Sequence, residues 1–322
     1  MAATAKSKPT VIALEEHYWD KEIAKHFTGH ASMRTPRLLE ELYDLNAIRL
    51  QAMDAAGVDV QVISHGAPSG QQLPAQVAAD ICREANDRLA EACGASPKRL
   101  AGFAALPTPD PKAAADELER VVTRHGFKGA MIHGLTHDKF LDRKEFWPIF
   151  ERAEALDVPI YFHPAEPHPA VIEAYYKDYE HEFPMFSTAA WGFGVETATQ
   201  AIRLVLSGVF DKYPKLKIIL GHMGENLPFA AWRIDHTIGR RNKSYSFMDV
   251  FCDRFWITTS GFFSTPALIC SMQVMGVDHI LFSIDWPFVK NEPAMDWMKD
   301  LPLSAQDKEK IYGANAKRLL KM

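Results

Sequence analysis

The chain has 322 residues, of which 47% are hydrophobic and 24% charged, and its formal net charge is −5. This composition is typical of a globular protein, and the sequence lacks both a basic stripe that would bind nucleic acid and the roughly 18 consecutive apolar residues of a membrane span. The four cysteines show no Cys-x-x-Cys spacing, and the N-terminus has no apolar core like that of a signal peptide. We therefore expect reduced thiols and a cytoplasmic protein with no nucleic-acid or membrane partner.

Short apolar runs rich in β-branched residues alternate along the chain with longer segments of helical spacing. The expected strands are 11–14, 59–63, 101–106, 128–133, 158–163, 217–221, 256–259 and 279–284. The expected helices are 36–56, 73–96, 110–125, 144–156, 195–211, 225–238, 265–275 and 304–320. Such alternation favours parallel strands joined by right-handed crossovers. Eight repeats in about 300 residues predict an α/β fold of the (β/α)8 barrel type, as a single domain over residues 1–322 with loop insertions.

An open doubly wound sheet is the alternative arrangement of the same elements. The sequence disfavours it, because there is neither a Gly-x-Gly-x-x-Gly motif nor a phosphate-loop motif. Two segments, 20–35 and 165–194, interrupt the repeat and are expected to be insertions. The second is rich in aromatic residues. It either covers an apolar substrate at the active-site face or forms a separate hydrophobic cluster under a long loop.

Imidazole and carboxylate side chains follow four of the expected strands, at the ends where barrel enzymes carry out their chemistry. These residues are Glu15, Glu16 and His17 after the first strand, His163 after the fifth, His222 and Glu225 after the sixth, and Asp285 after the eighth. Strand alternation places Glu15 and His17 on one side and Glu16 on the other. Histidines and carboxylates that converge in this way predict a divalent metal site with an open coordination position.

Each of these signals also has a simpler interpretation when it is taken alone. Glu15 and His17 fit a solvated strand end, and His163 fits a structural histidine. Glu225 either accepts a hydrogen bond from a ligand histidine or complements a helix N-terminus. Asp285 fits a cap of the following segment. The position of all these groups at strand ends of one barrel favours the metal site.

Longer motifs surround these residues and carry a resemblance to a known family. The motifs are 13–17, 103–107, 191–197, 207–214, 218–235, 258–261 and 281–288. Over nearly its whole length the chain resembles the decarboxylase branch of the amidohydrolase superfamily, the enzymes related to γ-resorcylate decarboxylase. The resemblance implies a (β/α)8 barrel with one divalent ion, Mn²⁺ or Zn²⁺, and no organic cofactor. It also implies a homodimer or homotetramer.

The same resemblance implies roles for individual residues. The metal ligands would be Glu15, His17, His163 and Asp285. A polar pair, His222 and Glu225, would lie beside them, and Arg233 would bind the substrate. The first strand reads Glu-x-His instead of His-x-His, and the fourth expected strand ends without a lysine, so a mononuclear site is favoured over a binuclear one.

Three residues depart from the family pattern. Close relatives have Asn at the ends of the second and fourth expected strands, where this chain has His65 and His133. We expect both histidines to line the substrate pocket and to affect which ring substituents fit. Glu166 also differs from the residue expected after the fifth strand.

The reaction that the resemblance implies is the non-oxidative decarboxylation of a small aromatic acid, an ortho-hydroxybenzoate of the γ-resorcylate, 2,3-dihydroxybenzoate or salicylate type. It would be reversible as a carboxylation. Asp285 would protonate the ring carbon, Arg233 would hold the carboxylate or a ring hydroxyl, and His222 with Glu225 would tune the protonation of the site. The alternatives are metal-dependent hydrolysis of a lactone or amide, and a barrel that serves as a non-catalytic scaffold.

Overall fold

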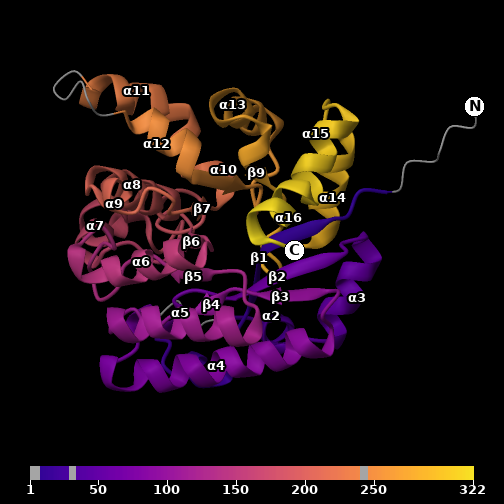
Figure 1. Cartoon of the computed structure of the whole chain (residues 1–322), viewed down its shortest axis with the longest axis horizontal. Helices are drawn as coiled ribbons and strands as arrows, with labels where there is room; N and C mark the ends of the chain where they lie inside the picture. Colours follow the sequence, from indigo (N-terminus) through magenta and orange to yellow (C-terminus); the bar gives the residue numbers. More distant parts are fainter. Residues whose placement is uncertain (1–7, 29–33, 240–245) are drawn as a thin grey trace, which may run out of the picture.

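The computed structural model describes residues 8–28, 34–239 and 246–322. Its strands lie in the centre of the molecule and its helices lie outside them (Figure 1). The strands are β1 (Ile12–Tyr18), β2 (Val60–His65), β3 (Leu100–Gly102), β4 (Ala104–Ala105), β5 (Ala130–His133), β6 (Ile160–His163), β7 (Ile218–Leu220), β8 (Phe255–Thr258) and β9 (Ile280–Leu281). All the expected strands therefore form, and the third is divided into β3 and β4.

The strands pair in parallel in their order along the chain, as β1-β2-β3 and as β4-β5-β6-β7-β8-β9. Between β3 and β4, the N–H of Phe103 donates to the carbonyl of Ile63 at 2.8 Å. A parallel bridge between Leu14 and Ser283 joins the last strand to the first. This arrangement agrees with the predicted barrel class and brings the carboxyl ends of all strands to one face.

The helices follow the strands as the alternation predicts. They are α1 (Lys21–Ala24), α2 (Pro36–Tyr43), α3 (Ala47–Ala56), η2 (Ser69–Gln72), α4 (Ala75–Ala95), α5 (Pro111–His125), η3 (Lys144–Phe146), α6 (Trp147–Leu156), α7 (Pro169–Val171), η4 (Ile172–Tyr176), η5 (Lys177–Tyr179), α8 (Gly192–Leu206), α9 (Val209–Lys212), α10 (His222–Glu225), α11 (Leu227–Gly239), α12 (Phe247–Arg254), α13 (Thr265–Met275), η6 (Val277–His279), α14 (Asn291–Asp300), α15 (Ala305–Glu309), η7 (Lys310–Ala314) and α16 (Asn315–Leu320). None of the helices within the described ranges is long and apolar enough to cross a bilayer.

Two of the expected helices are wrong as continuous elements. The segment 36–56 divides into α2 and α3, because the Asp44 side chain accepts hydrogen bonds from the backbone N–H groups of Asn46 and Arg49 and so caps a new helix. The segment 195–211 divides at Gly208, whose φ of +82° is left-handed. Two further helices, α12 and α14, were not among those expected from the sequence.

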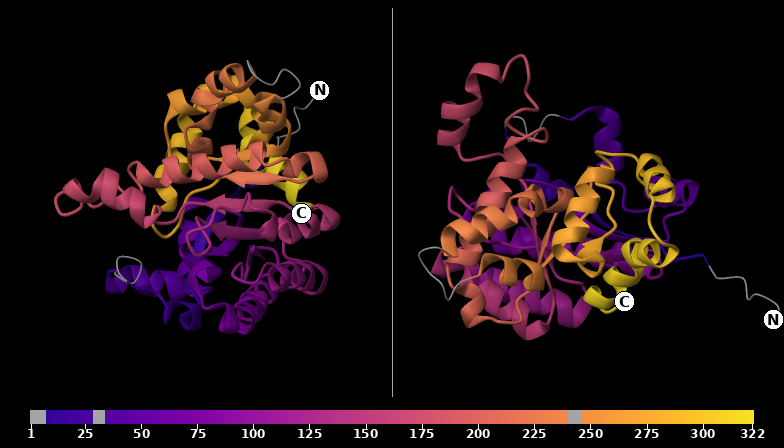
Figure 2. Two further views of the ribbon diagram at one scale, coloured as in Figure 1. Left: turned by 90° about the vertical axis from the view of Figure 1, so that its left-hand side faces the viewer. Right: turned by 90° about the horizontal axis from the view of Figure 1, so that it is seen from above.

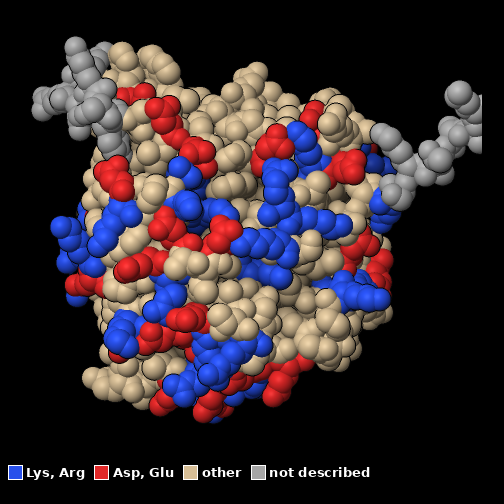
Figure 3. Space-filling view, viewed as in Figure 1, with Lys and Arg blue, Asp and Glu red and all other residues tan. Residues whose placement is uncertain are grey.

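Alternate strand residues fill the inside of the barrel. This inner cluster contains Ile12, Leu14, Val62, Ala101, Phe103, Met131, Tyr161, Ile219 and Leu281. A second, larger cluster packs the strands' other faces against the helices. Since both faces of each strand are buried, the strands read in the sequence as continuous apolar runs. On the face drawn in Figure 3, basic and acidic side chains are interspersed.

The two expected insertions differ in how they pack. In the first, Ile23 and Phe27 are buried beside Trp19, whereas residues 29–33 lie outside the described part of the chain. The second projects from the body of the molecule (Figure 2). In it the ring of Tyr176 packs on that of Phe186, with centroids 5.0 Å apart. Four of its other aromatic side chains are exposed, namely Tyr175, Tyr179, Phe183 and Trp191, whereas Phe193 is half-buried.

Candidate active site

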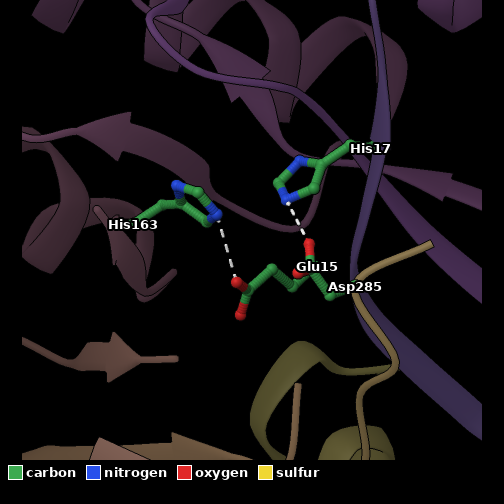
Figure 4. A group of neighbouring side chains, drawn as sticks. All are labelled: Glu15, His17, His163 and Asp285. Atoms are coloured by element: carbon green, nitrogen blue, oxygen red, sulfur yellow. Dashed lines mark ion pairs between the residues drawn. The ribbon is translucent and has the colours of Figure 1, made fainter. Parts of the chain in front are cut away.

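Four of the predicted site residues meet at the carboxyl ends of the strands. Glu15, His17, His163 and Asp285 each offer a ligand atom, and these atoms lie within 4.8 Å of one another. His17 Nε2 lies 3.3 Å from Asp285 Oδ1, and His163 Nε2 lies 3.2 Å from Glu15 Oε1 (Figure 4). We call these four residues the ligand cluster. The cluster is a geometric match to the metal site that the sequence predicts.

A local irregularity in β1 turns Glu15 into the cluster. The pairing of β1 with β2 shifts register between Ala13 and Glu16, and Glu15 has a φ of +59°. The expectation that simple alternation would place Glu15 and His17 on one side is therefore incomplete, because the strand contains a bulge. The solvated strand end is wrong as well: Glu15, Glu16 and His17 are all fully buried.

The two carboxylate oxygens of Glu15 have different surroundings. Oε2 accepts hydrogen bonds from the hydroxyls of Tyr161, Ser260 and Thr258. Oε1 faces the cluster and lies within ion-pair distance of His163 and His222, but neither contact has the geometry of a hydrogen bond. These three hydroxyl residues were not expected at the site from the sequence, although Thr258 and Ser260 lie within the motif 258–261. A hydroxyl that points into a barrel has no distinct sequence signal, because its neighbours come from other strands.

The imidazole rings of the cluster are oriented through their Nδ1 atoms. His17 Nδ1 lies 3.3 Å from Ser64 Oγ, and His163 Nδ1 lies 2.6 Å from the carbonyl oxygen of Pro164. Both Nε2 atoms are thereby turned toward the carboxylates. Contacts of this kind fix the tautomer and the ring orientation of metal-binding histidines in proteins.

The unpartnered atoms of the cluster fit a divalent cation. Glu15 Oε1, His17 Nε2 and Asp285 Oδ1 are buried and have no hydrogen-bond partner. Buried polar atoms without partners are costly unless a ligand satisfies them. Two imidazoles and two carboxylates form a mixed nitrogen and oxygen set that both Mn²⁺ and Zn²⁺ accept. The residues present therefore fit the predicted mononuclear site.

His222 and Glu225 form the predicted polar pair next to the cluster. His222 Nδ1 lies 2.8 Å from Glu225 Oε1, and His222 Nε2 lies 3.3 Å from Glu15 Oε1. The expected helix 225–238 is wrong at its start, because the chain first makes a left-handed turn. Every residue from 222 to 226 has a φ between +47° and +74°. L-residues adopt this conformation only at an energetic cost, which is typical of functional sites.

The surroundings of Asp285 and His222 raise the pKa of each residue to a different value. Burial, followed by the nearby carboxylate of Glu15, raises the pKa of Asp285 to about 7. Burial opposes the charge on His222, but the carboxylates of Glu15 and Glu225 outweigh it and raise the pKa of His222 to about 10. The raised pKa makes Asp285 a carboxyl group of the ligand cluster that can hold a proton near neutral pH.

The remaining predicted residues lie in different places. His65 and His133 are buried at the ends of β2 and β5. His133 Nδ1 lies 2.9 Å from His163 Nδ1, so this histidine contacts the ligand cluster directly. Arg233 is exposed on α11 and Glu166 is exposed after β6. Neither of these two belongs to the ligand cluster.

Comparison with known proteins places the chain in a family. Residues 15–322 match the family model described as Amidohydrolase. The chain belongs to the amidohydrolase family. Among curated relatives of this amidohydrolase is the γ-resorcylate decarboxylase of Polaromonas sp., 41% identical with coverage of 97% of this chain and 98% of the relative. The γ-resorcylate decarboxylase of Rhizobium sp. is 40% identical with the same coverage.

Solved structures of similar proteins include enzymes with bound ligands. A 2,6-dihydroxybenzoate decarboxylase in complex with 2,6-dihydroxybenzoate has a TM-score of 0.88 and 39% identity to this amidohydrolase, covering 98% of this chain and all of the other. The dihydroxybenzoic acid decarboxylase of Polaromonas sp., with bound manganese and 2-nitroresorcinol, also has a TM-score of 0.88 and 39% identity, covering 98% and 97%. The 5-carboxyvanillate decarboxylase of Sphingomonas paucimobilis has a TM-score of 0.90 at 32% identity, covering 98% and 100%.

Proposed function

We propose that this protein is a metal-dependent decarboxylase that releases CO₂ from an ortho-hydroxybenzoate, with γ-resorcylate (2,6-dihydroxybenzoate) as the first candidate substrate. The observation that carries the proposal is the buried ligand cluster of Glu15, His17, His163 and Asp285. Three of its candidate metal-ligand atoms make no hydrogen bond within the protein. The 41% identity to a γ-resorcylate decarboxylase over 97% of the chain supports the same reaction. The reverse carboxylation would run at high bicarbonate.

The four residues of the ligand cluster would hold one Mn²⁺ or Zn²⁺. When bound, the ion would act as a Lewis acid that orients the substrate and lowers the pKa of its phenol. The manganese found in a relative of 39% identity favours Mn²⁺. Chelation should abolish turnover, and adding the ion back should restore it.

The other steps belong to side chains of this chain. A protonated Asp285 would deliver its proton to the ring carbon that bears the carboxylate, so that CO₂ leaves without forming a bare aryl anion. His222, held by Glu225 at 2.8 Å, would keep a positive charge beside Glu15 and Asp285. Burial of the site excludes water and strengthens these electrostatic effects.

A panel of hydroxybenzoates, assayed for CO₂ release with Mn- and Zn-loaded protein, tests the proposal. We expect CO₂ and a phenol to form in equal amounts from at least one ortho-hydroxybenzoate, and a meta-hydroxy isomer to remain unreacted. Ring opening or amide cleavage without CO₂ would instead identify a hydrolase. A protein that binds no metal and turns over no substrate would be the scaffold alternative.

Arg233 is proposed to bind the substrate's carboxylate or a ring hydroxyl, since a guanidinium can hold a carboxylate by two charge-assisted hydrogen bonds. Arg233→Ala should then raise KM more than it lowers kcat, and Arg233→Lys should restore only part of the binding. Thr237 is exposed on the same helix and carries no charge, so Thr237→Ala serves as a control. An unchanged KM in Arg233→Ala would remove this assignment.

We also propose a homodimer or homotetramer in the cytoplasm. Support comes from α11, where Phe229 is 87% exposed and Trp232 65% exposed, since monomeric proteins rarely present such large apolar side chains together. The four cysteines are free, as a reducing compartment would keep them. Light scattering of the wild-type protein and of Phe229→Glu tests the assembly: the variant should dissociate, whereas a monomeric wild type would contradict it.

A further inference from the structure

His133 lies behind the ligand cluster, on the side of His163 that faces away from the carboxylates. The two residues are direct partners in the pairing of β5 with β6. Their rings pack edge to face with centroids 4.6 Å apart, and both side chains are buried. Both ring nitrogens of His133 therefore contact protein groups. Whether each of those groups donates or accepts determines which nitrogen of His133 carries the hydrogen.

Two backbone carbonyls fix the hydrogens on this pair of rings. His133 Nε2 lies 2.7 Å from the carbonyl oxygen of His65, which can only accept, so Nε2 carries the hydrogen. His163 Nδ1 lies 2.6 Å from the carbonyl oxygen of Pro164, so this nitrogen also carries a hydrogen. A neutral His133 then has its lone pair on Nδ1, which is 2.9 Å from His163 Nδ1 and shares the hydrogen of that nitrogen with the carbonyl of Pro164.

The reverse assignment does not work. A hydrogen on His133 Nδ1 would point at the hydrogen on His163 Nδ1. It would also leave the lone pair of a neutral His133 facing the carbonyl oxygen of His65. The consistent assignment leaves the lone pair of His163 on Nε2, the atom that faces Glu15 Oε1 at 3.2 Å. That is the nitrogen a metal ion requires.

We propose that His133 is a positioning residue that holds the ring of His163 in the orientation and tautomer needed for metal binding, and that it thereby sets the metal affinity of the site. The carbonyl of His65 anchors His133 from behind, and the side chain of Gln71 accepts a hydrogen bond from the backbone N–H of His133 at 3.2 Å. The inference rests on the proposed metal site. It replaces the expectation that His133 acts by lining the substrate pocket.

Three substitutions distinguish the contribution of the hydrogen-bond acceptor at His133 Nδ1 from that of the rest of the ring. In His133→Asn, the side-chain oxygen reaches the depth of Nδ1 and can still accept from His163. His133→Leu has nearly the same shape as the Asn variant but no acceptor. His133→Gln places a nitrogen at the depth of Nε2, which keeps the donor to His65 and loses the acceptor. His279→Leu is the control, because His279 also bonds a backbone carbonyl, that of Phe255 at 2.8 Å, at the opposite end of the strands.

The measurement is the dissociation constant for Mn²⁺ and Zn²⁺ of the metal-free full-length protein, by competition with a chelator. We expect His133→Leu and His133→Gln to weaken binding by about 10–100-fold, and His133→Asn and His279→Leu to stay within about threefold of the wild type. The same loss of metal affinity is expected of the Leu and the Gln variant. If one of them fails to fold, the other still tests the inference. Circular dichroism of the metal-free variants identifies those that are folded.

Unchanged affinity in a folded Leu or Gln variant would overturn the inference, as would an equal loss in His133→Asn and His133→Leu. Metal binding is measured without substrate, so this outcome is distinct from a failure of the proposed function. A wild type that binds metal tightly but releases no CO₂ would contradict the decarboxylase alone. A change in KM with unchanged metal affinity would return His133 to the substrate pocket.

Discussion

Glu16 holds the backbone on both sides of Asp285. Its Oε1 accepts the N–H of Ile284 at 3.0 Å and its Oε2 accepts the N–H of Trp286 at 3.2 Å. Asp285 itself has a φ of +78°, a conformation that L-residues rarely adopt without such support. The carboxylate that points away from the ligand cluster therefore determines where one member of that cluster lies.

Glu16→Gln should weaken metal binding and lower the free energy of unfolding by about 1–3 kcal/mol, because the new amide group would face a backbone N–H where an oxygen now accepts. Chelator competition and urea denaturation measure the two effects. Glu40→Gln, at an exposed position on α2, is the control and should change neither. Wild-type metal affinity in Glu16→Gln would contradict the role given to Glu16.

Asp285→Asn should lower kcat by about 10²–10⁴-fold, because the amide cannot deliver a proton to the ring. The assay uses variant protein whose bound metal has been quantified, so that a loss of metal is not mistaken for a loss of chemistry. Asp296→Asn, an exposed position on α14, should keep full activity. If metal-loaded Asp285→Asn retains more than a tenth of the wild-type rate, another group is the proton donor.

Gly261→Ala should impair catalysis beyond its effect on stability. Gly261 has a φ of +58°, and an added Cβ would contact Asp285 Oδ2 at 3.4 Å and His222 Cδ2 at 3.7 Å. Gly126 has a φ of +70° with nothing near an added Cβ, so Gly126→Ala shares the backbone cost of about 1–2 kcal/mol. Thermal unfolding should shift similarly in both variants, whereas KM should rise only in Gly261→Ala. The same KM in both variants would mean that the substrate does not contact the protein next to Gly261.

The ion pair of Asp20 with Arg88 should make stability fall in acid. Burial opposes ionisation, but two hydrogen bonds from Arg88, at 2.7 and 2.9 Å, outweigh it and hold the pKa of Asp20 below its ordinary value. A folded pKa below the unfolded one stabilises the protein above the unfolded pKa of about 4, and this contribution is lost as the pH falls through the folded pKa.

Asp20→Asn should therefore destabilise the protein at pH 7 and flatten the decrease in unfolding free energy below about pH 4. Urea denaturation across this pH range measures the slope. Asp80→Asn removes an exposed i,i+3 pair with Arg83 and should leave the slope unchanged. A wild-type slope in Asp20→Asn would show that other carboxylates dominate the acid sensitivity.

The regular parts of the fold could be predicted from the sequence. Buried strands such as 158–163 read as apolar runs, and a histidine or carboxylate directly after such a run marks the functional end of a barrel strand. This is why Glu15, His17, His163 and Asp285 could be grouped before any geometry was known. The family resemblance then favoured decarboxylation over the alternatives of metal-dependent hydrolysis and a non-catalytic scaffold.

The irregular parts of the site could not be predicted in this way. Periodicity assumes repeating backbone angles, whereas Glu15, Asp285 and the residues from 222 to 226 all have positive φ values that depend on partners elsewhere in the chain. Glu16 illustrates the same limit, because its partners are backbone N–H groups at the other end of the sequence. The contact between His133 and His163 depends on strand pairing, which no single segment encodes.

The ligand cluster draws its members from both ends of the chain: Glu16 and Trp286, next to the first and last ligands, are 270 residues apart. During synthesis the N-terminal segments leave the ribosome first. A nascent chain that ends before residue 285 has at most three of the four ligands, and it lacks the amides that Glu16 would hold. The complete ligand cluster can therefore form only after residue 286 has been synthesised, and a chain that stops earlier would hold a divalent ion with fewer ligands.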